Sequence, residues 1–143
     1  MSPTLHKTLR ADVADLVALG PEVEALLGRH GVPSNAVNKV RVVIEEMILN
    51  LINHATGLAG SLIDVRLEAV PGRVVILIED EGDPFDPRSA PEFDTTQPLE
   101  ERRAGGMGIQ LVRGFVAEMQ YERLSGRNRL RLVIACPGPG SPG

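Results

Sequence analysis

The chain has 143 residues, 43% of them hydrophobic, and this balance predicts a globular domain large enough to bury its own core. Its formal net charge of -4 disfavours nonspecific binding to nucleic acid or to an anionic membrane. Aromatic residues make up only 3%, which further argues against a base-stacking platform for single strands.

A single cysteine, Cys136, excludes an internal disulfide and a zinc site built from several cysteines. No apolar run reaches the roughly 18 residues that a membrane-spanning helix needs. The N-terminus also lacks the apolar centre of a signal peptide. We therefore expect a protein that acts in the cytoplasm, with neither nucleic acid nor a membrane as its partner.

The first part of the chain predicts a strand followed by helices. Residues 5–11 partly alternate between polar and apolar side chains, as an edge strand does. Residues 12–30 fit two descriptions: a helix that starts at Pro21 after a break, or one kinked helix that starts at Asp12. Residues 35–55 have apolar side chains at i+3 and i+4 spacing, and they predict a helix more strongly than any other segment.

The remainder predicts strands, one more helix and a long loop. Four segments have the alternation or the apolar runs of strands: 61–70, 73–79, 119–124 and 128–135. Residues 109–118 predict a helix preceded by a glycine-rich segment. Residues 87–104 are polar and show no period, and a loop of this length is usually functional or disordered. We expect one domain over residues 1–136 and a flexible Pro/Gly tail over residues 137–143.

Three polar side chains form a ridge along the helix predicted over residues 35–55. At roughly 100° per residue, Glu46, Asn50 and Asn53 fall within about 60° of each other, opposite the core stripe. A carboxylate can accept or orient a proton, and an amide oxygen can ligate Mg²⁺ without adding charge. This spacing alone is common on solvated helix faces. Apolar residues flank the ridge, however, and suggest that a ligand, a lid or a subunit covers it: Val42, Val43 and Leu49.

Two glycine-bearing segments have the composition of nucleotide contacts. Asp80, at the exit of a buried strand, can accept from the exocyclic amine of a purine, and Gly82 lets the backbone approach a planar ring. Gly105, Gly106 and Gly108 stand at a helix start, where N–H groups and the helix dipole favour phosphate. Each segment alone also fits an ordinary turn or hinge. The sequence contains neither a P-loop nor a Rossmann glycine motif.

The three motifs together, in this order, are more specific than any one of them. Residues 45–55 resemble the N box of the GHKL (Bergerat-fold) ATPases, and residues 80–87 and 105–113 resemble their two glycine boxes. Within that superfamily the chain looks like the anti-sigma-factor serine/threonine kinases, over about residues 11–133. We therefore expect an α/β two-layer sandwich, with a mixed and mostly antiparallel sheet and its helices on one face.

The resemblance implies a role for each polar motif residue. Glu46 would help to activate an attacking hydroxyl, and Asn50 would ligate the Mg²⁺ that bridges the phosphates of ATP. Asp80 would recognise adenine, with Gly82 beside it. The implied cofactors are thus ATP and Mg²⁺, and the implied chemistry is phosphoryl transfer by positioning and charge neutralisation.

The resemblance also implies a phosphate cradle, a lid and protein partners. Gly106 and Gly108 would approach the phosphates, and residues 87–104 would form a lid over ATP. Such kinases phosphorylate a Ser or Thr of a STAS-type anti-anti-sigma protein. They also sequester a sigma factor, usually as a homodimer.

Some residues depart from the family's pattern or fit two roles. Leu49 stands directly before the N-box asparagine, where a small polar residue is commoner. His54 fits either a contact with the phosphates or ordinary packing. The lid segment offers few cations: Arg88, Arg102 and Arg103. The alternative to a kinase is therefore a module that binds ATP without catalysis and sequesters a sigma factor or another regulator.

Overall fold

The computed structural model describes residues 4–54, 62–84, 86–87 and 106–136. Most of the expected lid, residues 88–104, and the expected tail, residues 137–143, lie outside this part. The elements in chain order are β1 (Thr4–Arg10), α1 (Val13–Arg29), α2 (Ser34–His54), β2 (Leu62–Val70), β3 (Arg73–Asp80), α3 (Gly106–Phe115), β4 (Glu118–Leu124) and β5 (Arg127–Ala135).

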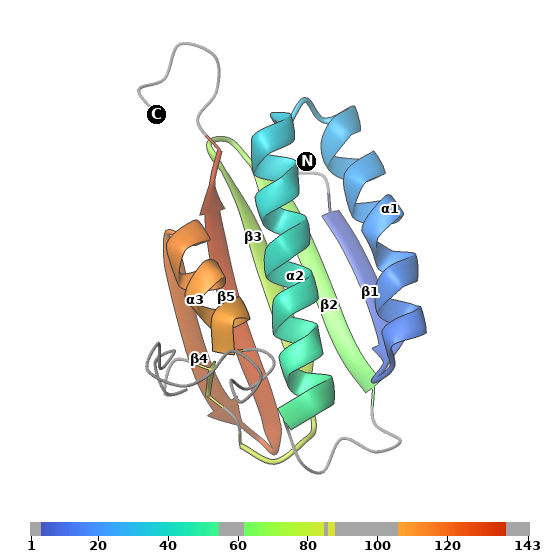
Figure 1. Ribbon diagram of the computed structural model, residues 1–143, viewed down its shortest axis with the longest axis vertical. Helices are drawn as coiled ribbons and strands as arrows, with labels where there is room; N and C mark the ends of the chain where they lie inside the picture. Colours follow the sequence, from blue (N-terminus) through green and yellow to red (C-terminus); the bar gives the residue numbers. More distant parts are fainter. Residues whose placement is uncertain (1–3, 55–61, 85, 88–105, 137–143) are drawn as a thin grey trace.

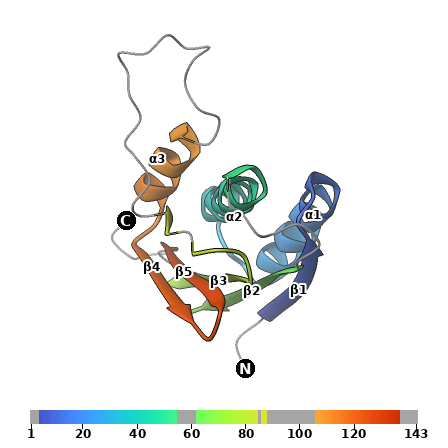
Figure 2. The same cartoon turned by 90° about the horizontal axis from the view of Figure 1, so that it is seen from below.

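The five strands form one sheet in the order β1-β2-β3-β5-β4 (Figure 1). Every described pairing is antiparallel, although the sequence-based expectation allowed a mixed sheet. The three helices of the described residues lie on one face of the sheet, which makes two layers (Figure 2). The predicted fold class is thereby confirmed. We call the face covered by helices the inner face and the opposite face the outer face.

A tight turn connects the two strands of each hairpin, β2–β3 and β4–β5. Gly72, in the turn between β2 and β3, has φ +80°, a left-handed conformation that glycine adopts without a steric penalty. Between β4 and β5, Ser125 and Gly126 have φ +52° and +78°, and two successive positive φ angles are typical of a type I′ hairpin turn. These turns fix the register of β2 against β3 and of β4 against β5.

The core lies between the helices and the inner face. Alternate residues of β2 and β3 are buried, because successive side chains of a strand point to opposite faces. Helix α2 runs between α1 and α3 and supplies the centre of this layer (Figure 1). The largest fully buried side chains are aliphatic, as the scarcity of aromatics predicts: Leu19, Leu27, Met47, Ile48, Ile63, Leu67, Ile76, Ile78, Leu132, Ile134, Val23 and Val40.

Helix α1 resolves the two descriptions left open for residues 12–30. It is one helix from Val13 to Arg29 with Pro21 inside it, and it does not restart at the proline. The carboxylate of Asp12 caps its start by accepting from the N–H of Asp15, at 2.8 Å. The buried leucine and valine stripe on both sides of the proline holds the helix together despite the missing hydrogen bond.

Helix α3 differs from its predicted bounds at both ends. It begins at Gly106 instead of residue 109, and it ends at Phe115 instead of residue 118. The last helical bond runs from the N–H of Val116, and the N–H of Ala117 instead donates to the carbonyl of Val133 on β5, at 2.7 Å. Residues 117 and 118, which apolar periodicity assigned to the helix, therefore bond to the sheet or belong to it.

The last described residue, Cys136, is held against the sheet. The thiol of Cys136 is buried, and burial raises its pKa above the ordinary value. The backbone N–H of the same residue donates to the carbonyl of Gly72 at 2.9 Å, which anchors the end of β5 to the β2–β3 turn.

Among the described helices, none is both long and apolar enough to cross a membrane.

Candidate nucleotide site

A small pocket lies between α2 and the inner face, at the end of the sheet where β3 stops. Most of its lining is aliphatic, with a few convergent polar groups, which is the usual composition of such a site. The lining residues are Met47, Asn50, Leu51, Ile78, Asp80, Pro87, Tyr121, Asn128 and Leu130.

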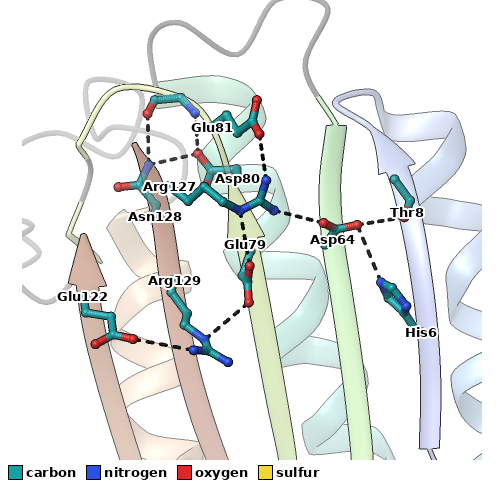
Figure 3. Close-up of polar contacts among 11 residues, drawn as sticks. His6, Thr8, Asp64, Glu79, Asp80, Glu81, Glu122, Arg127, Asn128 and Arg129 are labelled. Carbon is teal, nitrogen blue, oxygen red and sulfur yellow. Dashed lines mark hydrogen bonds and ion pairs between the residues drawn. The ribbon is translucent and has the colours of Figure 1, made fainter. Parts of the chain in front are cut away.

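Asp80 ends β3 and faces the pocket with only 2% of its surface exposed. One carboxylate oxygen, Oδ1, accepts from the backbone N–H of Gly82 and from the side-chain amide of Asn128, both at 2.9 Å. These bonds hold the carboxylate at the strand exit, as Figure 3 shows. Asp80 and Gly82 are thus hydrogen-bonded to each other at the strand exit, and their joint role at a nucleotide site stays a prediction.

Asn128 and Tyr121 complete this arrangement, and the sequence reasoning missed both as site residues. Asn128 is directly opposite Asp80 in the β3–β5 register and is 3% exposed. Tyr121, on β4, bonds to the amide oxygen of Asn128 at 2.5 Å. A signal did exist in the sequence, because Asn128 is a polar residue at an inward position of a strand whose next inward positions are Leu130 and Leu132.

Asn50 lines the same pocket from α2 and is 4% exposed. Its side-chain nitrogen is buried and has no hydrogen-bond partner among the described residues. An unpaired buried polar group is unfavourable, so in a natural protein it indicates a missing ligand, ion or water. Asn53, predicted on the same ridge, is exposed instead and does not line the pocket.

The start of α3 meets Glu46 next to this pocket. A Cβ built on Gly108 would lie 2.9 Å from the carboxyl carbon of Glu46 and closer still to its Oε2. No side chain larger than hydrogen fits there unless Glu46 moves. Glu46 is half-buried one turn before Asn50 on α2. The first turn of α3, whose N–H groups have no partner within the helix, therefore approaches the polar ridge of α2 here.

The ridge is covered in part, since Glu46 is half-buried and Asn50 is buried, whereas Asn53 is exposed. Val43 is fully buried, and Val42 and Leu49 are half-buried. Helix α3 packs against α2 and buries Ile109 and Val112, so a segment of the same chain provides part of the cover. The sequence left a ligand, a lid or a subunit open, and the structure adds this intramolecular contact.

Several predicted site residues cannot be placed. Gly105, the three lid arginines and most of the lid are outside the described residues, and the side chain of His54 is also outside them. Gly106 is described only as the first residue of α3. Of the predicted motif residues, the structure therefore brings together Glu46 with Gly108, and Asn50 with Asp80, around one end of the sheet.

Comparison with known proteins identifies relatives over most of the chain. The sequence model of the histidine kinase-like ATPase domain family matches residues 9–134. The serine/threonine-protein kinase BtrW of Bordetella bronchiseptica is 30% identical over 90 residues, which is 62% of this chain and 63% of that protein. The serine-protein kinase RsbW of Staphylococcus aureus is 22% identical over 122 residues, or 81% of this chain and 76% of that protein.

A solved structure has the same fold. It contains the RsbU and RsbW domains of a Mycobacterium tuberculosis protein and superposes with a TM-score of 0.63 at 18% identity. The superposition covers 95% of this chain and 33% of that one. This chain therefore spans under two thirds of BtrW and a third of the M. tuberculosis chain.

Proposed function

Because the chain belongs to the histidine kinase-like ATPase domain family, we propose that it binds ATP with Mg²⁺ in the pocket beneath α2 and is a protein serine/threonine kinase. Its proposed substrate is a Ser or Thr of a STAS-type anti-anti-sigma protein, and its second partner is a sigma factor that it sequesters. The names of BtrW and RsbW as kinases support the activity. A homodimer that acts in the cytoplasm is part of the same proposal.

The contact between Glu46 and Gly108 is the observation that carries this proposal. It joins the N-box carboxylate on α2 to the glycine-opened start of α3, although the two are far apart in the sequence. The pocket with Asn50 and Asp80 lies beside it. A pocket lined by a buried amide, with a carboxylate and a helix start one helical turn away, suits a nucleotide whose phosphates lie toward α3.

Each residue then has a defined task. Asp80 accepts from the 6-amino group of adenine, with Gly82 beside it, and the first turn of α3, including Gly106 and Gly108, binds phosphate through backbone N–H groups. Glu46 orients the substrate hydroxyl and takes its proton. The hydroxyl oxygen forms a bond to the terminal phosphorus while the bond from that phosphorus to the bridging oxygen of ADP breaks.

The residues present also fit Mg²⁺. No cluster of three His, Cys, Asp or Glu side chains that could hold a metal exists among the described residues. Mg²⁺ does not require one, since it usually binds through one or two protein oxygens, the substrate phosphates and waters. Asn50, which lines the pocket, is the proposed protein ligand through its amide oxygen. Bound Mg²⁺ would neutralise phosphate charge during transfer.

A phosphate-transfer assay tests the kinase proposal. The purified chain is incubated with Mg²⁺, ATP labelled at its γ-phosphate and a STAS-domain protein of the same organism, and label on the STAS protein is measured. We expect transfer, and we expect Glu46→Gln to slow it by about 100-fold or more while ATP affinity changes little. The matched control is Glu45→Gln, since Glu45 is the half-exposed neighbour that contacts Arg41. Binding of ATP without any transfer would instead support a non-catalytic module.

The proposed Mg²⁺ ligand has a separate test. Asn50→Ala should abolish the difference between ATP affinities measured with Mg²⁺ and with EDTA, because the amide oxygen is gone. The fold should persist, since the nitrogen removed has no partner in the described structure. Titration calorimetry gives both affinities, and an unchanged Mg²⁺ dependence would refute the assignment of Asn50.

A further inference from the structure

We propose that Asn128, held in place by the hydroxyl of Tyr121, is a positioning and specificity residue that makes Asp80 accept only purines carrying a 6-amino group. This inference rests on the proposed nucleotide function and deepens it. Neither residue belongs to the three motifs found in the sequence. Both line the pocket beside Asp80.

The amide nitrogen of Asn128 is surrounded by acceptors. It lies 2.9 Å from Oδ1 of Asp80 and 2.9 Å from the carbonyl of Asp83, with the carbonyl of Gly82 at 3.4 Å. None of these three oxygens can donate, because carbonyls and carboxylates only accept. Chemistry therefore fixes which end of the amide faces Asp80: the NH₂ group.

The hydroxyl of Tyr121 locks the other end of the amide. It lies 2.5 Å from Oδ1 of Asn128, and an amide oxygen only accepts, so the phenol must donate. If the Asn128 amide rotated by half a turn, its oxygen would face the carboxylate of Asp80 and its NH₂ group would face Tyr121. Tyr121 thus opposes the one rotation that would turn attraction into repulsion at Asp80.

The consequence for Asp80 is that its two oxygens become different. Oδ1 accepts from both Gly82 and Asn128, whereas Oδ2 receives no hydrogen bond from the described residues. Because these two donors occupy Oδ1, the oxygen offered to the pocket is Oδ2. On a carboxylate Oδ2 only accepts, which suits the 6-amino group of adenine and repels the 6-oxo group of hypoxanthine.

Binding of ADP and IDP measures this selectivity without phosphate transfer, because IDP carries a carbonyl oxygen where ADP carries the amine. We expect the wild-type chain to prefer ADP by roughly 100-fold or more, since a site built for a hydrogen bond rejects the partner that lacks it. Tyr121→Phe should reduce this preference about tenfold by releasing the amide. Asn128→Asp should nearly abolish it, because two carboxylates so close share a proton and can then donate to the 6-oxo group.

Arg123→Gln is the matched control for mere support of the loop. Arg123 donates to the carbonyl of Gly82 at 2.6 Å and has no described contact with Asp80. Its loss should weaken ADP and IDP by a similar factor and leave their ratio unchanged. Tyr121→Phe keeps the aromatic ring and should therefore fold. Its ratio of ADP to IDP affinity tests the inference even if Asn128→Asp does not fold.

The outcomes separate this inference from the proposed function. A wild-type preference for ADP that stays unchanged in Tyr121→Phe and in any folded Asn128→Asp would overturn the role of Asn128 while nucleotide binding stands. A wild-type chain that binds neither diphosphate would overturn both. A ratio that falls in Tyr121→Phe but not in Arg123→Gln supports the inference.

Discussion

The two faces of the sheet differ sharply at the end where β3 and β5 meet. On the inner face, Asp80 and Asn128 are almost wholly buried, and each depends on a few specific bonds. On the outer face, one position away along each strand, lies a cluster of three carboxylates around one guanidinium (Figure 3). This outer cluster consists of Asp64, Glu79, Glu81 and Arg127.

Both networks have overlapping partners, but the outer cluster is partly exposed whereas the inner network is buried. Glu79 is paired with Arg129 as well as with Arg127, and Asp64 is also held by Thr8 and by His6. Water and salt weaken such pairs, whereas a buried polar group that loses its partner keeps the full desolvation penalty. The loss of one partner should therefore cost little stability in the outer cluster and much more in the inner network. We call the inner network strict in this sense.

The strongest test of this difference is Asn128→Ala. It leaves the buried carboxylate of Asp80 with the N–H of Gly82 as its remaining described donor, and it strips the carbonyl of Asp83 of a bond. We expect a loss of about 3 kcal/mol in the free energy of unfolding, measured with urea and no nucleotide. Arg129→Ala, on the same strand but the outer face, is the matched variant. Equal losses in the two would remove the distinction between the faces.

The start of α3 provides a second strict contact on the pocket side. Gly108→Ala places a methyl group against Glu46, which must rotate away. Relative to Gly114→Ala on the same helix, we expect a stability lower by about 1 to 2 kcal/mol, together with slower phosphate transfer. Gly114 has open space around its Cβ position, so alanine there should stabilise by about 0.5 kcal/mol. Urea unfolding of both variants shows whether each substitution raises or lowers the free energy of unfolding. A stabilising Gly108→Ala would contradict the close contact between Gly108 and Glu46.

Local pattern was sufficient to predict most elements. The apolar residues of α2 recur at helical spacing, and those of β2 and β3 alternate, so each element could be identified within its own window. The candidate residues Glu46, Asn50 and Asp80 could also be named from the sequence, because the spacing within each motif is local, and their roles stay predictions. The expected fold followed from the order of these motifs.

The long-range contacts could not be predicted in the same way. Asn128 reaches Asp80 across 48 positions, and only because β5 inserts between β3 and β4 in one register. The need for glycine at residue 108 depends likewise on how closely α3 approaches α2. The end of α3 was misplaced for a related reason, since Ala117 bonds to a strand that comes later in the chain. A sequence window contains none of these partners.

Arg127→Gln should have a smaller effect than either substitution on the pocket side. Three carboxylates lose a partner, at 2.8 to 3.3 Å, but they are partly exposed and two of them keep other contacts. We expect a loss below about 1 kcal/mol at low salt, and a smaller one in about 1 M NaCl, because salt screens exposed pairs. Urea unfolding at the two salt concentrations gives both values. A loss above about 2 kcal/mol, unaffected by salt, would show that the outer cluster is as strict as the inner network.

The smallest expected effect is the pH-dependent contribution of Asp64. Its pKa lies below the ordinary value of 3.8, chiefly because Thr8 donates to it at 2.7 Å, with Arg127 and His6 adding to the hydrogen bond and burial opposing it. A depressed carboxyl pKa means that the folded state binds this proton less readily than the unfolded chain does. The resulting stability is therefore present above pH 3.8 and is lost as the pH falls through the folded pKa.

Thr8→Val removes the principal cause while keeping the shape of a β-branched side chain. We expect wild type to exceed this variant by about 0.5 kcal/mol at neutral pH, because the bond is charge-assisted but exposed. The gap should shrink toward zero below pH 3.8, where Asp64 takes up its proton in both proteins. Thr4→Val, at an exposed position of the same strand, should show no such pH dependence. A gap that persists unchanged in acid would assign the effect of Thr8 to packing instead of to the carboxylate.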